Sequence, residues 1–108
     1  MNIKHSELNT DKEGFLKNLS DWTPEAANLL AKNEGITLTE EHWEIIKLLR
    51  DFYQQFEISP AMRILVKTAK TSLGDKKGNS IHLMKLFPGS PAKLASKIAG
   101  LPKPTNCL

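Results

Sequence analysis

The sequence predicts a mainly helical domain, a small α+β fold of about five helices with a short N-terminal β-hairpin and an extended C-terminal arm. Three observations favour this fold class. Hydroxyl residues stand directly before proline at three places, as at a helix N-cap followed by the first helical residue. Glycines follow several apolar segments, where helices commonly end. Two prolines near the C-terminus exclude helix there. The hydroxyl–proline pairs are Thr23–Pro24, Ser59–Pro60 and Ser90–Pro91.

Length and composition indicate one globular domain. The chain has 108 residues, enough for a single modest core. Its 40% hydrophobic and 25% charged residues are ordinary for such a domain. No apolar run approaches the roughly 18 residues of a membrane span, and the first residues lack the apolar segment of a signal peptide. A single cysteine fits a reducing compartment, so we expect a cytoplasmic protein that contacts no membrane.

The N-terminal segment carries the weakest structural signal. Residues 2–10 alternate loosely, with apolar Ile3 and Leu8, and predict a short hairpin that turns near residues 5–6. The polar run at residues 11–14 ends in glycine and predicts a turn. Phe15 and the leucine after it are then the first apolar anchor of the core.

The first two helices are predicted at residues 24–33 and 40–57. The first stops before Gly35, and the second is capped by Thr39, with two glutamates in its first turn where the helix dipole favours them. The apolar positions of the second helix cover more than one stripe, which predicts a central helix buried on much of its circumference. Those positions are Trp43, Ile45, Ile46, Leu48, Leu49, Phe52, Tyr53 and Phe56.

Three further helices are predicted at residues 60–73, 79–87 and 91–99. The helix at 60–73 stops at a glycine and keeps its apolar residues on one side, while its cations lie on another. The short helix that follows is ended by a proline, and the last helix stops at Gly100. We therefore divide the chain into a helical domain, residues 1–100, and an arm, residues 101–108.

Charge is distributed unevenly between the two halves of the chain. Residues 1–54 hold six Lys/Arg and ten Asp/Glu, whereas residues 55–108 hold nine and two. The halves therefore carry −4 and +7, which make up the net charge of +3. A basic C-terminal half indicates an acidic or anionic partner surface, although lysines on solvated helix faces would give the same count.

The chain shows little other local chemistry. Its histidines, His5, His42 and His82, are isolated from one another and from the one cysteine, so no metal site is predicted. No glycine-rich phosphate loop and no local signature of a nucleophile–base pair occur. We expect no cofactor, and we expect the histidines to act as surface or cap residues.

The C-terminal arm carries the sole cysteine, Cys107, next to the end of the chain. Pro102 and Pro104 push the arm to extended geometry, with a rise of roughly 3.1 Å per residue or about 25 Å over eight residues. A thiol at the tip of such an arm can enter the active site of another protein, which indicates a carrier of sulfur. The alternative is that the cysteine is incidental, as many single cysteines are.

A second reading comes from the two helices at residues 40–73. A long helix, a short break and a second helix with Arg63, Lys67 and Lys70 resemble a helix-turn-helix in outline. That reading predicts a nucleic-acid-binding regulator. A third reading is an assembly partner of a sulfur enzyme that binds without carrying sulfur.

Several segments together resemble the DsrC/TusE family over nearly the whole chain. The penultimate Cys107 is similar to the thiol that defines this family. The resemblance implies a helical fold and a sulfurtransferase that carries sulfur as a persulfide on Cys107. The segments are residues 42–53, 59–67, 77–80, 86–88, 91–93 and 97–104, with Asp11 and residues 14–16 towards the N-terminus.

The family divides on a second cysteine eleven residues before the terminal one, and here that position is Ser96. This difference favours the single-cysteine, TusE-type sulfur-relay branch over the DsrC-type partner of sulfite reductase. The resemblance implies a TusBCD-like sulfur donor complex and an MnmA-like tRNA thiolase as partners, with tRNA as an indirect one. Candidate partner-binding residues are Arg63, Lys67, Lys93, Lys97 and Lys103.

Overall fold

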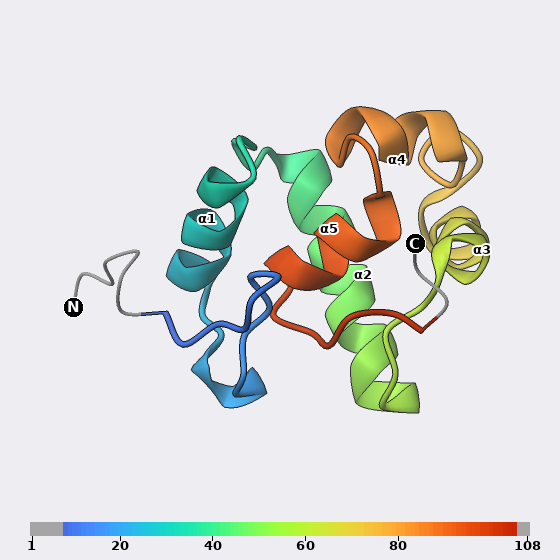
Figure 1. Ribbon diagram of the computed structural model, residues 1–108. Coiled ribbons are helices and arrows are strands. Elements are labelled where there is room, and N and C mark those ends of the chain that lie inside the picture. The colour runs from blue at the N-terminus through green and yellow to red at the C-terminus, as the bar shows by residue number, and fades with distance from the viewer. Residues whose placement is uncertain (1–7, 106–108) are drawn as a thin grey trace.

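Five α-helices follow one another in residues 8–105, the part of the chain that this computed structural model describes (Figure 1). A single 3₁₀ turn, Leu19–Asp21, precedes them. The predicted mainly helical fold is confirmed, and each boundary lies within two residues of its prediction. The helices are α1 (Pro24–Asn33), α2 (Glu40–Phe56), α3 (Met62–Leu73), α4 (Ser80–Leu86) and α5 (Pro91–Ile98).

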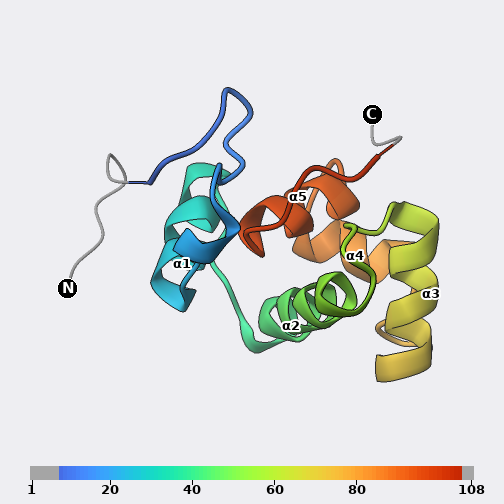
Figure 2. The ribbon, with the colours of Figure 1, turned by 90° about the horizontal axis from the view of Figure 1, so that it is seen from below.

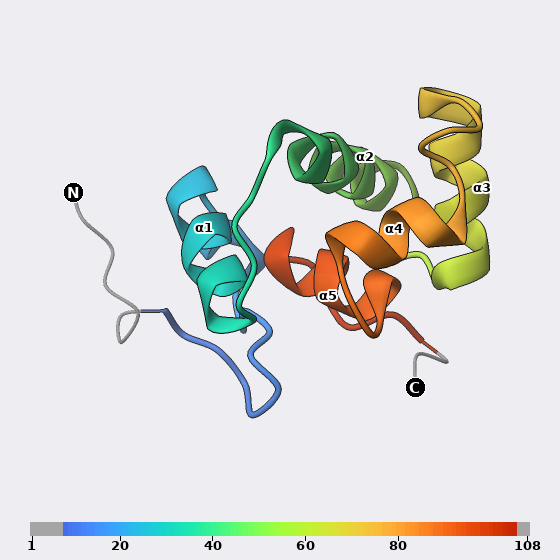
Figure 3. The same ribbon diagram turned by 90° about the horizontal axis from the view of Figure 1, so that it is seen from above.

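Helix α5 occupies the centre of the fold. It packs against each of the other four helices, which surround it in Figures 2 and 3. Small side chains, Ala92 and Ala95, let the neighbouring backbones approach closely, and Ile98 is fully buried. The sequence predicted that α2 is a central helix buried on much of its circumference. That prediction is wrong, because α2 buries only one face, through Ile45, Ile46 and Leu49.

The hydroxyl–proline pairs mark helix starts at two of three places. The Thr23 hydroxyl accepts from the Ala26 amide at 3.0 Å, as an N-cap should, and α5 begins at Pro91 as predicted. At Ser59–Pro60 the prediction is wrong, because α3 begins only at Met62 and its N-cap is Ala61. The Ser59 hydroxyl is used elsewhere, as described below.

The start of α2 is joined to α4 by a buried histidine. His42 Nδ1 accepts from the Thr39 amide at 3.0 Å, and its Nε2 lies 2.8 Å from the Leu86 carbonyl oxygen. Because Nδ1 accepts, Nε2 carries the proton and donates to that carbonyl. The ring also meets Phe87 edge-on, with centroids 5.2 Å apart. His42 is thus a cap residue, as predicted.

The predicted N-terminal hairpin is not supported. Most of it falls on residues 1–7, which lie outside the described residues. From residue 8 onward the strand-like pairing is a single antiparallel bridge between Thr10 and Leu16. The turn between them is confirmed, since an Asp11 carboxylate oxygen accepts from the amides of Glu13 and Phe15. Phe15 and Leu16 are buried, as predicted.

Candidate functional site

The C-terminal end of α5, from which the arm departs, is fixed by two side chains. Trp22 Nε1 donates to the Ile98 carbonyl at 2.9 Å, and Arg50 Nη1 donates to the Ala99 carbonyl at 2.7 Å. These carbonyls lie at a helix end, where intrahelical partners are lacking. The guanidinium also lies over the indole ring, 3.8 Å from its centroid. Burial lowers the pKa of Arg50 from its ordinary value. The base of the arm is therefore held from two separate segments.

Gly100 is required at this base for two reasons. Its φ of +73° lies in the left-handed region that side chains rarely adopt. A Cβ there would lie 2.3 Å from Trp22 Cδ1, far inside van der Waals contact. The chain can turn from α5 into the arm, directly beneath the indole, only because this residue has no side chain.

The first residues of the arm lie on the body. Leu101 is 3% exposed and belongs to the core, and its amide donates to the Ser96 carbonyl at 2.9 Å. The Ser59 hydroxyl donates to the Pro102 carbonyl at 2.6 Å, and Pro104 is buried. Residues 101–104 are non-helical, as predicted, and they pack against the body, a point that the sequence had left open. The division at residue 100 stays a prediction.

An exposed carboxylate joins the arm to α5. Glu13 lies 3.2 Å from Lys103 Nζ on the arm and 3.2 Å from Lys93 Nζ on α5. Hydrogen bonds from Lys103 and then Lys93 lower the pKa of Glu13 below its ordinary 4.5. Two of the predicted partner-binding lysines are thus engaged within the molecule. Because these pairs are exposed, they guide the arm weakly.

Of the remaining predicted partner-binding residues, two are exposed and one is buried. Arg63 and Lys67 are exposed on α3, and among the described residues no carboxylate pairs with them. Lys97 is only 7% exposed, with its Nζ 3.4 Å from Glu34 and 5.2 Å from the centroid of the Phe15 ring. Its burial does not support the prediction that it contacts a partner. Cys107 lies outside the described residues.

Ser96 is fully buried on α5 beneath the arm. Its hydroxyl has no hydrogen-bond partner within the described chain, which is unusual for a buried polar group.

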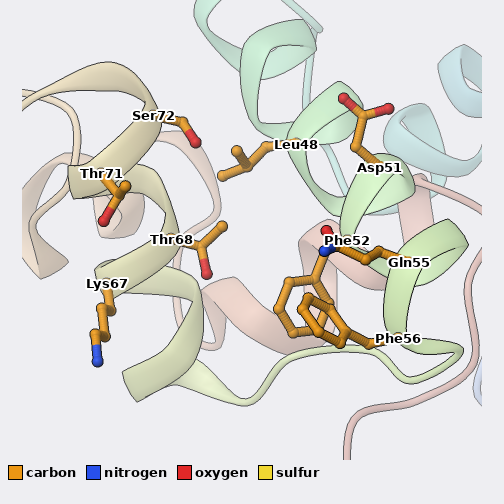
Figure 4. A pocket seen from close by; sticks show the side chains of 9 residues that line it. All are labelled: Leu48, Asp51, Phe52, Gln55, Phe56, Lys67, Thr68, Thr71 and Ser72. Carbon is orange, nitrogen blue, oxygen red and sulfur yellow. The ribbon is translucent and has the colours of Figure 1, made fainter.

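A groove between α2 and α3 was missed by the sequence reasoning. It encloses about 360 Å³, with Leu48, Phe52 and Phe56 on its α2 side and hydroxyl residues of α3 opposite (Figure 4). Phe56 was predicted as a core position, yet it is 52% exposed. The signal that could have indicated this surface is the excess of apolar positions on α2 over what one buried face needs.

The described residues offer no other evident chemistry. Among residues 8–105, no group of three or more His, Cys, Asp or Glu side chains could hold a metal ion. No helix in that range is long and apolar enough to cross a membrane.

The chain is a small helical domain with a C-terminal arm that is fixed at its base, and its sole cysteine is the penultimate residue. The family model described as "DsrC like protein" matches residues 2–108, and the chain belongs to that family.

Curated relatives cover nearly the whole chain. "Sulfurtransferase TusE" of Photorhabdus laumondii is 57% identical over 102 residues, which are 94% of this chain and 92% of the relative. "Sulfurtransferase TusE" of Escherichia coli K12 is 53% identical over 102 residues, 94% of each chain.

Solved structures share the fold. The NMR structure of Allochromatium vinosum DsrC has a TM-score of 0.83 and 52% identity, and it covers 92% of this chain and 88% of that one. The crystal structure of oxidized DsrC, the gamma-subunit of the dissimilatory sulfite reductase from Archaeoglobus fulgidus, has a TM-score of 0.80 and 44% identity. It covers 94% of this chain and 92% of that one.

Proposed function

We propose that this protein is a sulfur carrier that accepts sulfane sulfur on Cys107 and passes it along a relay to 2-thiolation of the wobble uridine of tRNA. The donor is a TusBCD-like complex, the acceptor an MnmA-like tRNA thiolase, and the compartment the cytoplasm. The curated relatives confirm the predicted class, a sulfurtransferase. The cysteine, the partners and the compartment are our proposal.

The chemistry needs one thiol and two partners. The Cys107 thiolate attacks the outer sulfur of the donor's persulfide, a new S–S bond forms, and the donor leaves as a thiolate that takes up a proton. The reverse exchange at the acceptor restores the Cys107 thiol. No cofactor enters either step, because sulfur moves at the same oxidation level in both.

The observation that carries the proposal is the way the arm is fixed up to Pro104. Cys107 follows Thr105 by two residues, and two trans peptide units span at most about 7.6 Å. Chain connectivity therefore limits the distance of the sulfur from the described end of the arm, which favours partners that approach the molecule there. A carrier gains from such restriction, because each partner meets the sulfur in a limited volume.

Ser96 supports the single-cysteine branch over the sulfite-reductase partner. A serine hydroxyl cannot form a disulfide or trisulfide with Cys107, so chemistry that needs a second thiol in the same chain is closed to this protein. Persulfide exchange with a partner needs only one thiol in this chain, so it remains open to Cys107.

The proposal is tested by loading the protein with glutathione persulfide and weighing the intact chain. We expect the added mass of one sulfur atom, removed by a reductant and absent in Cys107→Ser. Ser96→Ala is the matched control, since it changes a side chain near the arm but no thiol, and it should load normally. An adduct that persists in Cys107→Ser contradicts the assignment.

A further inference from the structure

We propose that the α2–α3 face is the surface on which an acidic, sulfur-exchanging partner protein docks. This face comprises the groove between α2 and α3 together with the exposed side chains of Phe56, Ile58 and Ile64. The inference rests on the proposed function and adds to it the place and the kind of contact.

Three large apolar side chains of the α2–α3 face are exposed to solvent. Phe56 is 52% exposed, Ile58 58% and Ile64 42%, and they cluster at the end of α2, in the following loop and in the first turn of α3. Apolar side chains gathered in this way are costly to leave in water, and such patches commonly mark protein–protein contacts. The three residues therefore indicate a covered surface.

The groove between α2 and α3 adjoins these side chains, since Phe56 also lines it. Figure 4 shows the rings of Phe52 and Phe56 projecting side by side from α2 towards α3, and their centroids lie 4.6 Å apart. On the opposite side the Thr68 hydroxyl donates to the Ile64 carbonyl at 2.7 Å, so its proton is already used within α3. A volume of about 360 Å³ with this lining suits apolar side chains of a partner better than a polar small molecule.

The α3 side of this face is positively charged. Helix α3 carries Arg63, Lys67 and Lys70 and no acidic residue. All three cations are exposed, and within residues 8–105 none of them has an ion-pair partner. Asp51 and Glu57 on the α2 side offset them only in part. A partner that fits this rim presents acidic residues around an apolar projection.

The α2–α3 face lies next to the described part of the arm. Ile58 adjoins Ser59, the residue whose hydroxyl holds the Pro102 carbonyl. In all three ribbon views the described end of the arm lies beside the start of α3 (Figures 1–3). A protein seated on the α2–α3 face therefore sits next to the point from which Cys107 is tethered.

Aliphatic residues favour a protein over a nucleic acid as the occupant. Sequence-independent binding of single strands uses aromatic stacking and phosphate contacts. Phe56 and the cations of α3 would suit either kind of occupant, whereas Ile58 and Ile64 supply neither stacking nor phosphate contacts and do supply the apolar centre of a protein interface. RNA binding is accordingly an outcome that the test must be able to reveal.

The test compares two sulfur donors on the full-length chain. Glutathione persulfide is small and needs no docking surface, whereas a persulfide-loaded TusBCD-type complex must dock. Ile58→Ser combined with Ile64→Ser removes the apolar contact. Ile81→Ser is the matched control, because Ile81 is an isoleucine that is 70% exposed on α4, away from this face.

We expect the double variant to load from the complex at least about tenfold more slowly, because the loss of central interface residues commonly weakens binding by that factor or more. Loading from glutathione persulfide should be unchanged, and so should both reactions of Ile81→Ser. Unchanged urea midpoints should show that these exposed substitutions leave the fold intact. Arg63→Gln with Lys67→Gln should slow loading from the complex at low salt, with the difference fading at high salt.

A wild-type loading rate in the double variant, or equal slowing in Ile81→Ser, overturns the docking face. Loss of tRNA binding in the double variant with unchanged loading from the complex assigns the face to RNA and also overturns the proposal. Failure of the wild-type chain to load from glutathione persulfide instead overturns the proposed function, so the two failures are distinguishable.

Discussion

Gly100→Ala should destabilise the protein by an amount that separates backbone strain from steric conflict with Trp22. Gly35 provides the matched control, because both glycines have φ of +73° and a Cβ at Gly35 would meet nothing within 4 Å. Left-handed geometry costs a non-glycine residue about 1–2 kcal/mol, and the lower entropy of the unfolded alanine chain offsets about 0.4–1 kcal/mol. Gly35→Ala should therefore cost about 0–1.6 kcal/mol.

At Gly100 the steric conflict is added to that strain. The new Cβ would lie 2.3, 2.6 and 2.8 Å from Trp22 Cδ1, Cγ and Cβ. The indole cannot move aside without losing its hydrogen bond to Ile98 and its contact with Arg50. Overpacking of this kind costs about 1–3 kcal/mol, so with the strain included we expect Gly100→Ala to cost about 1–4.6 kcal/mol in all.

Urea denaturation of the two glycine variants and of wild type measures the difference. Adding Trp22→Ala completes a double-mutant cycle, since removal of the indole should reduce the cost of Gly100→Ala to that of Gly35→Ala. Equal costs for the two glycine variants in the wild-type background would refute the steric argument. So would an undiminished cost of Gly100→Ala in the Trp22→Ala background.

Three further predictions follow from single contacts. Ser96→Ala should stabilise the protein by about 1 kcal/mol in urea denaturation, because it removes a buried hydroxyl that has no described partner; a loss of stability would reveal a bond that we have missed. Lys103→Met should raise the pKa of Glu13 towards 4.5, as followed by carboxyl NMR, and an unchanged value would mean that the pair does not persist in solution. Because the folded pKa of Glu13 is lowered, its stabilising contribution is present above about pH 4.5 and is lost as the pH falls through the lowered value. His42→Ala should cost about 1–3 kcal/mol in urea denaturation, since it leaves the Thr39 amide and the carbonyl of the half-buried Leu86 without this partner, whereas a cost near zero would place both groups in contact with water.

Helix boundaries were predictable because their causes are local. A hydroxyl, a proline or a glycine acts within one turn, so Thr23–Pro24 and Pro91 could be read directly from sequence. Ser59 shows the limit of this reasoning. Its hydroxyl bonds to Pro102, 43 residues away, and no local pattern reveals that a hydroxyl has a distant acceptor.

Burial was harder to predict than secondary structure. Lys97 was expected on the surface, yet it is buried between Phe15 and Glu34, because a lysine stem packs well while its ammonium finds a carboxylate. Phe56 was expected in the core and lies exposed, because α2 extends past the part of the body that could cover it. Periodicity identifies an apolar side of a helix but not how far along the helix the neighbours reach.

At the candidate site, too, some features could be predicted from the sequence and others could not. The penultimate Cys107 and the prolines of the arm are visible in sequence and led to the sulfur-carrier prediction. The means by which the arm is fastened, through Trp22, Arg50 and Ser59, depend on residues from three separate segments. These contacts arise only when the chain has folded, so sequence reasoning had no access to them.

The bond between Trp22 and Ile98 joins residues 76 positions apart, and Arg50 closes a separation of 49 positions at the same end of α5. Because each bond joins distant parts of the chain, neither can persist without the folded body, and we expect both to be lost together with it. An unfolded chain would lose both bonds, so the base of the arm at Ile98 and Ala99 is fixed only while the body is folded. Amide hydrogen exchange at Gly100 and Leu101 should accordingly follow global unfolding rather than fraying of a terminus.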